Sequence, residues 1–199
     1  MIAPISRFAR KQFLHKLMLR TASLVVLSSF TLIATSQFAV AQPVSHSARQ
    51  DPAGAAKLVK LVRKGTKQYV DVNNATAAGY GPFLGCVAGT DHGAMGIHYV
   101  NGTLLGNLTL DPAQPQALIY EPSNGKMTLV GVEFILDSAS WLAANNNTAP
   151  VLDGQVFNFV GAPNRFNIPS FFELHVWAWR DNPQGSFVDW NNDVTCDGQ

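Results

Sequence analysis

The stretch FFELHVWAWR, residues 171–180, has the two-residue alternation of a β-strand but no face suited to water. Its even positions are all apolar, whereas its odd positions combine aromatic side chains with Glu173 and His175. A strand with one wet face alternates apolar with polar residues, so this pattern predicts a central strand that is buried on both sides. A carboxylate and an imidazole in such a strand need polar partners inside the protein.

The N-terminal region has the organisation of an export signal. A basic stretch without acids precedes an apolar segment, residues 22–34, that is too short to span a bilayer, and residues 39–41 (AVA) form a small-x-small cleavage site. We predict a signal peptide at residues 1–41, a disordered segment at residues 42–51 and a single domain at residues 52–199. The protein would then be exported, to the periplasm or the cell exterior, with no membrane span after cleavage.

The charge balance of the chain argues against a nucleic-acid partner. All thirteen Asp and Glu residues lie beyond residue 41, whereas five of the fourteen Lys and Arg residues lie before it. The remaining chain is mildly acidic and lacks the clustered basic excess that binds nucleic acid. The basic residues between positions 57 and 67 follow helical spacing, which indicates a solvated helix face.

The chain contains two cysteines, Cys86 and Cys196. In an exported protein this predicts a disulfide between them. The alternative is a thiolate that binds metal or acts as a nucleophile.

The pattern beyond the leader predicts an α+β fold with two N-terminal helices and then a curled antiparallel sheet, as a partial barrel or a sandwich. Residues 52–63 have helical periodicity, and Thr66 has the character of an N-cap for a second helix that ends near Gly79. Strands are expected at residues 96–100, 104–108, 117–121, 127–136, 156–160 and 171–180, and a short helix from residue 141. Asn124-Gly125 between two apolar runs predicts a hairpin turn, and Asp153-Gly154 predicts another turn.

The acidic residues divide by type between loops and strands. The ten aspartates lie in predicted loops, turns or element edges, whereas the three glutamates, Glu121, Glu133 and Glu173, lie in predicted strands. Two histidines, His98 and His175, are also in predicted strands. Because an unpaired buried charge costs several kcal/mol, Glu133 should have a partner, and these two histidines are the obvious candidates.

Imidazole and carboxylate groups that converge from separate strands are suitable ligands for a divalent transition metal such as Zn, Fe, Mn or Cu. We therefore predict a metal site formed by His98, Glu133 and His175, with Glu121, Glu173 and the loop residue His92 as additional candidates. Gly131 would leave room for a ligand near the backbone. The alternative is a buried His–Glu pair that only stabilises the core.

Several stretches of the chain occur together as a block. They are GAMGIHYVN, ALIYEP, LVGVEF and FELHVWAWRDNPQGSFVDWN, followed by Cys196. With small variations on MGxHYxN, LxYE, LVGVEY and LHxWxWxxNPxGxFxxWN, they resemble a family of exported bacterial proteins without an established activity. The resemblance spans roughly residues 66–196 and implies no function. It does imply that Asn101, Asn182, Pro183 and Trp190 belong with the His and Glu positions, which adds Asn101 to the candidates.

Three functions are compatible with these patterns. The first is a semi-buried His/Glu pocket that binds a divalent metal and supports metal-assisted chemistry on a small molecule. The second is a non-catalytic module that binds an apolar or sugar ligand in a cavity lined by aromatic residues such as Trp177, Trp179 and Trp190. The third is a structural envelope protein. The oligomeric state stays open.

Overall fold

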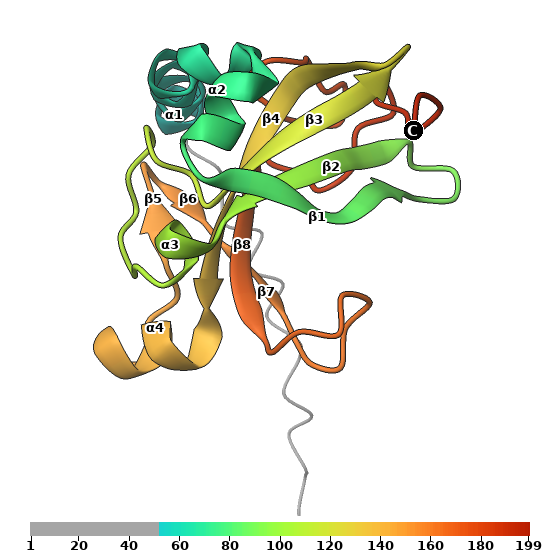
Figure 1. Ribbon diagram of the computed structural model, residues 1–199. Coiled ribbons are helices and arrows are strands. Elements are labelled where there is room, and N and C mark those ends of the chain that lie inside the picture. The colour runs from blue at the N-terminus through green and yellow to red at the C-terminus, as the bar shows by residue number, and fades with distance from the viewer. Residues whose placement is uncertain (1–51) are drawn as a thin grey trace, which may run out of the picture. The chain divides into compact units, whose positions relative to one another are not determined.

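The computed structural model describes residues 52–199, and its central feature is a six-stranded antiparallel sheet with the order β1-β2-β3-β4-β8-β7 (Figure 1). Two further strands, β5 and β6, form a separate hairpin. The strands are β1 (Tyr80–Ala88), β2 (Ala94–Asn101), β3 (Ala117–Ser123), β4 (Lys126–Asp137), β5 (Val151–Leu152), β6 (Gln155–Val156), β7 (Asn158–Val160) and β8 (Phe171–Val176).

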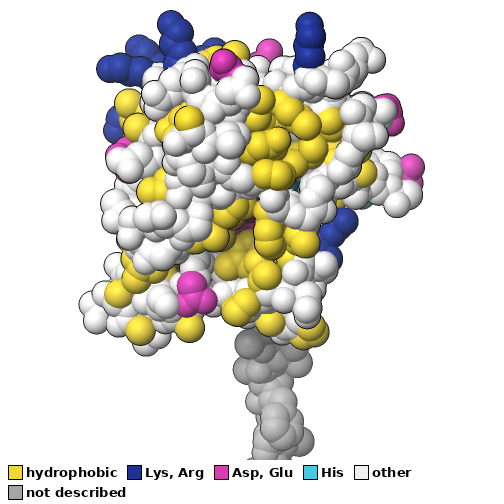
Figure 2. All heavy atoms as spheres, viewed as in Figure 1, with side chains coloured by type: hydrophobic (Ala, Val, Ile, Leu, Met, Phe, Trp, Pro, Cys, Tyr) yellow, Lys and Arg dark blue, Asp and Glu magenta, His cyan; other side chains and the backbone are white. Residues whose placement is uncertain are grey.

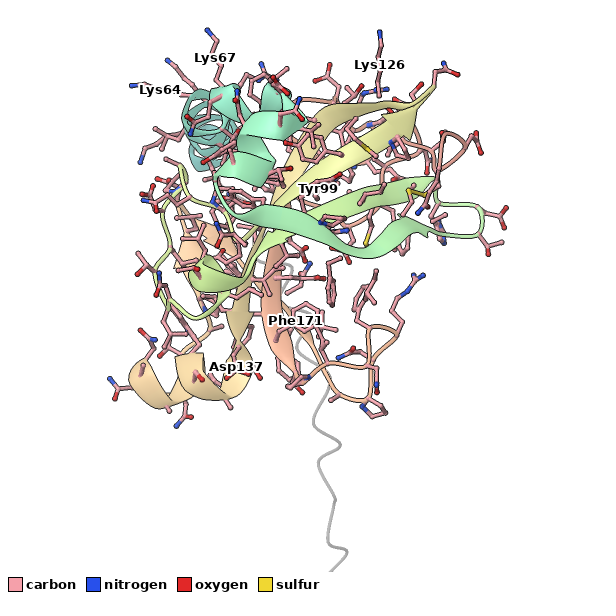
Figure 3. All side chains as sticks on the ribbon, in the orientation of Figure 1. Lys64, Lys67, Tyr99, Lys126, Asp137 and Phe171 are labelled. Carbon is pink, nitrogen blue, oxygen red and sulfur yellow. A yellow bond between two sulfur atoms is a disulfide. The ribbon has the colours of Figure 1, made fainter. Side chains whose placement is uncertain are left out.

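The helices are short apart from the first. They are α1 (Pro52–Gly65), the 3₁₀ helix η1 (Lys67–Val70), α2 (Val72–Ala77), α3 (Gly102–Leu105) and α4 (Ser138–Ala144). The basic residues between positions 57 and 67 are exposed, as their spacing predicted. Lys64 and Lys67 extend away from the protein (Figure 3). The predicted leader and the segment at residues 42–51 lie outside the described residues.

The predicted α+β class, with two helices followed by a partial barrel or sandwich, is wrong. The described chain is mostly antiparallel sheet, its helices are concentrated before β1, and the main sheet has two free edges at β1 and β7. The expected second helix does not form as one element because Asp71, and not Thr66, provides the N-cap of α2. The Thr66 hydroxyl instead donates a hydrogen bond back to the carbonyl of Val62 at 2.8 Å.

Individual elements met the sequence expectations to different degrees. The hairpin turn at Asn124-Gly125 is confirmed, since both residues have positive φ as a type I′ turn requires. The strand expected at residues 104–108 is wrong, because the Asn101 side chain accepts hydrogen bonds from the backbone N–H groups of Thr103 and Leu104 and starts α3 there. Strand β1 was missed.

One face of the sheet carries the main hydrophobic core. Strand β8 is buried along its whole length, as its sequence predicted, and its even-numbered side chains point into this core. Leu58 and Val62 of α1 pack against the same core. The fully or largely buried members include Leu118, Tyr120, Val132, Phe134, Leu136, Phe172, Leu174 and Val176. Burial of this size supplies most of the stability of the domain.

Hydrogen bonds from long side chains fix the N-terminal helices to the sheet. The Tyr120 hydroxyl donates to the carbonyl of Tyr69 at 2.6 Å, and the Trp179 indole N–H donates to the Thr66 hydroxyl at 3.0 Å. The Arg63 guanidinium donates to a backbone carbonyl just after β8 at 2.6 Å. These contacts hold α1 and η1 in one position over the sheet, so one face is closed by helices.

The opposite face is covered by irregular chain. Residues 177–199 run behind β2 and β3 in the view of Figure 1 and contribute Trp177 and Val194 to a small second core with Ala94, Ile119 and Val130. The predicted disulfide is confirmed: Cys86 of β1 and Cys196 are joined, and neither thiol is free. The bond closes a loop of 110 residues between the sheet edge and the end of the chain.

We expect Leu174→Ala to lower the free energy of unfolding by about 2–5 kcal/mol, because it leaves a cavity in the main core. Leu174 is only 2% exposed, whereas Leu61 on α1 is 36% exposed. Leu61→Ala is therefore the matched control and should cost far less. Urea denaturation of both variants measures the difference, and equal losses would contradict the assignment of β8's even positions to the core.

Candidate functional site

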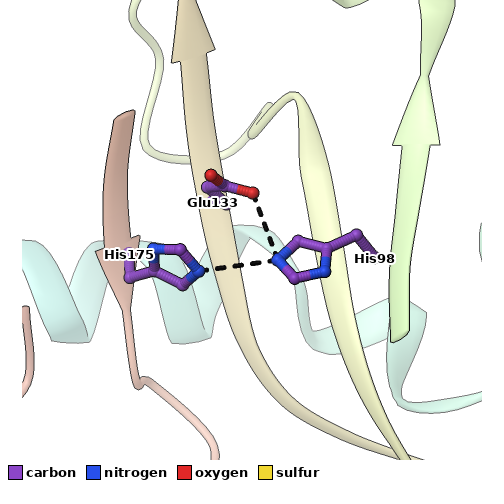
Figure 4. A group of neighbouring side chains, drawn as sticks. All are labelled: His98, Glu133 and His175. Atoms are coloured by element: carbon purple, nitrogen blue, oxygen red, sulfur yellow. Dashed lines mark hydrogen bonds and ion pairs between the residues drawn. The ribbon is translucent and has the colours of Figure 1, made fainter. Parts of the chain in front are cut away.

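Three strands bring His98, Glu133 and His175 together on the face of the sheet away from the helices (Figure 4). Glu133 of β4 pairs directly with His175 of β8. His98 projects from β2, and the strand between β2 and β4 places the small residue Ala117 opposite Glu133. Residues that are paired across neighbouring strands point to the same face, and His98 pairs with Ile119, two residues from Ala117, so the three side chains share one face. The methyl group of Ala117 leaves space for His98 to reach across.

The ligand atoms of the three residues all lie within 4.8 Å of one another, and two of their separations are those of neighbouring ligands around one ion. His98 Nε2 lies 3.5 Å from His175 Nε2 and 3.3 Å from Glu133 Oε2. Ligands about 2.0–2.1 Å from a tetrahedral zinc ion are separated from each other by roughly 3.3 Å. The three residues are 7%, 4% and 0% exposed for His98, Glu133 and His175, so the group is enclosed by protein.

Two further acids surround the group. Glu173 lies on the same face of β8 as His175, and the Glu133 carboxyl donates a hydrogen bond to it. Asp189, in the C-terminal segment, places Oδ1 3.7 Å from His175 Nδ1 and accepts a hydrogen bond from Asn158 of β7 at 3.4 Å. His175 Nδ1 is fully buried and has no hydrogen-bond partner among the described residues. Glu173, His175 and Asp189 thus form a second set of possible metal ligands.

Burial keeps both imidazoles neutral. It lowers the pKa of His98 to about 4. Burial, and then the neighbouring His98, hold the pKa of His175 well below its usual range. A neutral imidazole has a lone pair available for a metal, so both histidines are in the form that binds one.

The carboxyl groups show the opposite effect. Burial, then the nearby Glu173, and then Asp189 raise the pKa of Glu133 well above its ordinary value. Burial and then Asp189 raise the pKa of Glu173 to about 7, although the hydrogen bond from Glu133 opposes this rise. Burial also raises the pKa of Asp189. Without a metal, the 3.3 Å contact between His98 and Glu133 therefore joins two neutral groups and is no ion pair.

No basic side chain compensates these acids within residues 52–199. The ion pairs that lysine and arginine form there are Lys57 with Asp153 and Arg180 with Glu121. Neither involves Glu133, Glu173 or Asp189. Two buried acids, the half-buried Asp189 and two neutral histidines, without a lysine or arginine partner, form a site in which a divalent cation would be electrostatically favoured.

The other residues that the sequence suggested lie elsewhere. Glu121 pairs with Arg180 and accepts a hydrogen bond from the backbone N–H of Thr195 at 3.0 Å, so it anchors the C-terminal segment. His92 is exposed in the loop between β1 and β2. Asn101 is the N-cap of α3 and also donates to the carbonyl of Ala78 at 3.0 Å.

Gly131 makes room for a neighbouring strand and not for a ligand. A Cβ at this position would lie 3.0 Å from the carbonyl oxygen of Val176 and 3.3 Å from the Trp177 ring. The register of β3 with β4 also shifts just before Gly131, so Leu129 lies in the main core, although strict two-residue alternation would place it on the same face as Glu133.

Sequence reasoning did not identify Asp189. All ten aspartates were assigned to loops or element edges, and Asp189 indeed lies in an irregular segment. Its position inside the block FELHVWAWRDNPQGSFVDWN was the available signal, because the same block contains Glu173 and His175.

A cavity of about 350 Å³ opens onto the site. His98, Glu133 and Glu173 contribute to its wall, whereas His175 lies behind it. Most of the remaining wall is apolar, and Figure 2 shows hydrophobic side chains lining a recess in the middle of the face it presents. The other residues of the wall are Phe83, Leu84, Val87, Met95, Val100, Leu105, Ile135, Asp137, Phe166, Ile168, Pro169, Ser170 and Phe171.

No family model, curated protein or solved structure matches this chain. Within residues 52–199, no helix has the length and apolar character needed to cross a membrane.

We expect protein kept free of metal by a chelator to lose stability as the pH rises above about 7, until the raised pKa of folded Glu133 is passed. An unfolded glutamate is ionised throughout this range, whereas folded Glu133 retains its proton because its pKa is raised. Unfolding then releases a proton, and the free energy of unfolding falls by up to about 1.4 kcal/mol per pH unit. The histidines do not contribute, since they are neutral in both states above their unfolded pKa of about 6.5.

Urea denaturation at a series of pH values measures this slope. Glu133→Gln cannot ionise, so its slope should be flatter than that of the parent protein. Asp137→Asn is the matched control, because Asp137 has a lowered pKa and lies at the end of the same strand. If the Gln variant retains the full slope, the proton is not held at Glu133.

Proposed function

We propose that the protein binds one divalent transition metal through His98, Glu133 and His175 and uses it in chemistry on a small molecule in the adjoining cavity. The observation that carries the proposal is the approach of His98 Nε2 to both His175 Nε2 and Glu133 Oε2, at 3.5 and 3.3 Å, in a buried group of acids without a basic partner. Two imidazoles and one carboxylate leave coordination positions open for a substrate.

Zinc is the metal that this donor set favours, because two imidazoles and one carboxylate are ligands that zinc takes at sites with an open position. Two histidines with one carboxylate also bind non-haem iron(II), so iron is the second choice. A divalent ion in this position acts as a Lewis acid that polarises an oxygen-bearing group of the substrate.

The surrounding residues have separate roles in this proposal. His98 and Glu133 line the cavity and would face the open positions, whereas His175 holds the ion from behind. Glu173, beside Glu133 in the wall, can hold or accept a proton close to the substrate. Asp189 can accept a hydrogen bond from Nδ1 of His175 and so orient the ring, as carboxylates beside metal-bound histidines commonly do.

We also propose that the protein acts outside the cytoplasm. The disulfide between Cys86 and Cys196 supports this, because structural disulfides persist in oxidising compartments. The export signal expected at residues 1–41 agrees with such a location.

We expect the parent protein to bind Zn²⁺ at a ratio of one ion per chain, and His98→Ala, Glu133→Gln and His175→Ala each to weaken binding by at least about 100-fold. Loss of an outer partner alone typically costs 10–100-fold, so loss of a ligand should cost at least as much. His175→Ala should destabilise the fold only modestly, because a space lined by polar groups can fill with water. Calorimetric titration and elemental analysis of protein purified from its native compartment measure these effects.

Two controls separate ligand loss from general damage. His92→Ala removes an exposed histidine, and Asp137→Asn makes the same acid-to-amide change outside the group. Both should bind Zn²⁺ like the parent. If the three ligand variants lose stability strongly and the parent binds no metal, the group only stabilises the core.

Asp189→Ala should weaken Zn²⁺ binding by about 10–100-fold without abolishing it, because the orientation of His175 would be lost while all three ligands remain. Asp193→Ala, an exposed acid in the same segment, is the control and should leave the affinity unchanged. An Asp189 variant with the parent's affinity would show that this carboxylate does not orient the ring.

A further inference from the structure

The wall of the cavity is unlike that of a sugar site. Eleven of its sixteen residues are apolar, and the polar ones are His98, Glu133, Asp137, Ser170 and Glu173. A sugar presents hydroxyl groups on all sides and needs many hydrogen-bond partners, whereas here the two buried carboxyls and the histidine gather near the proposed metal. An apolar molecule gives up few hydrogen bonds with water when it enters a cavity with such a wall.

The tryptophans do not supply a stacking platform. Trp177 is buried in the second core and donates its indole N–H to the carbonyl of Val188 at 2.6 Å. Trp179 packs on the main core, and the Trp190 ring lies against Gly89. None of the three contributes to the cavity wall. The apolar lining comes instead from aliphatic, methionine and phenylalanine side chains of β1, β2, α3, β4 and residues 166–171.

The entrance of the cavity is apolar as well. Phe83 and Leu84 of β1 belong to the wall, yet their exposed fractions are 41% and 60%. Exposed large hydrophobic residues beside a cavity favour the entry of an apolar molecule from water. At about 350 Å³ the cavity is near the lower end of the range of small-molecule sites, roughly 300–1,000 Å³.

The charges around the cavity disfavour an anion, and the proposed metal removes the preference for a cation. The wall contains Glu133, Asp137 and Glu173 but no lysine or arginine. Arg165, the basic residue beside the wall, stacks its guanidinium on the Phe166 and Trp190 rings and is not part of the wall itself. A bound divalent ion would offset the buried acids, and an apolar wall penalises any net charge on the ligand.

We propose that the cavity binds an uncharged, mainly apolar molecule whose single oxygen-bearing group, such as a hydroxyl or a carbonyl, reaches the end formed by His98 and Glu133. The body of the molecule lies against the apolar wall, and the oxygen occupies the open side of the metal group. This assignment rests on the proposed metal centre for the recognition of the oxygen, but the apolar part of the site depends only on the cavity.

Linear alcohols and their charged counterparts test the proposal by calorimetric titration of the zinc-loaded protein. 1-Octanol should bind at least tenfold more tightly than octanoate or octylamine, because only the alcohol brings an oxygen without a charge. From 1-butanol to 1-hexanol, each methylene should tighten binding about fourfold, as burial of apolar surface requires. Equal or tighter binding of octanoate or octylamine, or no dependence on chain length, would overturn the proposal.

Two filling variants test the location of the site. Ile168→Trp and Leu105→Trp place a large side chain in the cavity from different segments, and both residues are only half-buried, so at least one variant should fold. Each should weaken 1-octanol binding at least tenfold and leave the zinc ratio unchanged. Val156→Trp, at an exposed position outside the wall, is the matched control. Unchanged octanol binding in folded filling variants would exclude this cavity.

The failure of this proposal can be distinguished from the failure of the metal proposal. His98→Ala should lose zinc, bind 1-octanol more weakly, and still show the dependence on chain length. If the parent protein binds zinc but shows no such dependence for alcohols, the cavity assignment is wrong and the metal centre stands. If the parent protein takes up no zinc but binds alcohols with this dependence, the metal centre is wrong and the cavity assignment stands.

Discussion

Three carboxyl groups and two imidazoles are held inside one face of a sheet without a lysine or arginine to balance them. Each such group would cost several kcal/mol if it were buried alone and charged. The protein limits this cost by keeping the histidines neutral and by keeping Glu133 protonated. The Glu133 carboxyl then donates a hydrogen bond to Glu173. These effects operate only while the five groups lie close together. The strands that carry them and the C-terminal segment must therefore keep their positions.

The two faces of the same strands have different roles: one carries the hydrophobic core that stabilises the fold, and the other carries the site. Leu174 and Phe134 project into the core beneath α1, whereas His175 and Glu133, their neighbours in sequence, project to the other side. Strand β4 is paired with β3 and β8 on either side of Glu133, and β8 is paired with β4 over its whole length, so hydrogen bonds fix the backbones that carry Glu133 and His175. Side chains on such strands hold their separations well, which a metal centre requires.

The C-terminal segment completes the site without regular secondary structure. It is attached to the sheet by the disulfide at Cys196, by the ion pair between Arg180 and Glu121, and by a backbone bridge between Asn191 and Ala94. These attachments position Asp189 beside His175. Four acids are therefore divided between two tasks: Glu121 fixes the segment, whereas Glu133, Glu173 and the half-buried Asp189 surround the histidines.

The sequence by itself determined the local features. Alternation along residues 171–180 predicted a strand buried on both faces, which forms over Phe171–Val176. Asn124-Gly125 and Asp153-Gly154 predicted turns, and the burial cost of Glu133 indicated a histidine partner. These features follow from local backbone geometry and from the solvation of each side chain, and neither depends on the tertiary structure. The same reasoning predicted the pairing of the two cysteines, which had no other partner of their kind.

Only the tertiary structure decided the class of the fold and the membership of the site. The open order of the sheet, the capping of α2 by Asp71, and the register shift before Gly131 depend on contacts between distant segments, for which a single sequence has no periodic signal. Asp189 reaches His175 through an irregular segment, so neither alternation nor helical spacing could connect them. Periodicity states which face a side chain occupies, but convergence in space is set by strand order and by the attachment of the chain that covers the sheet.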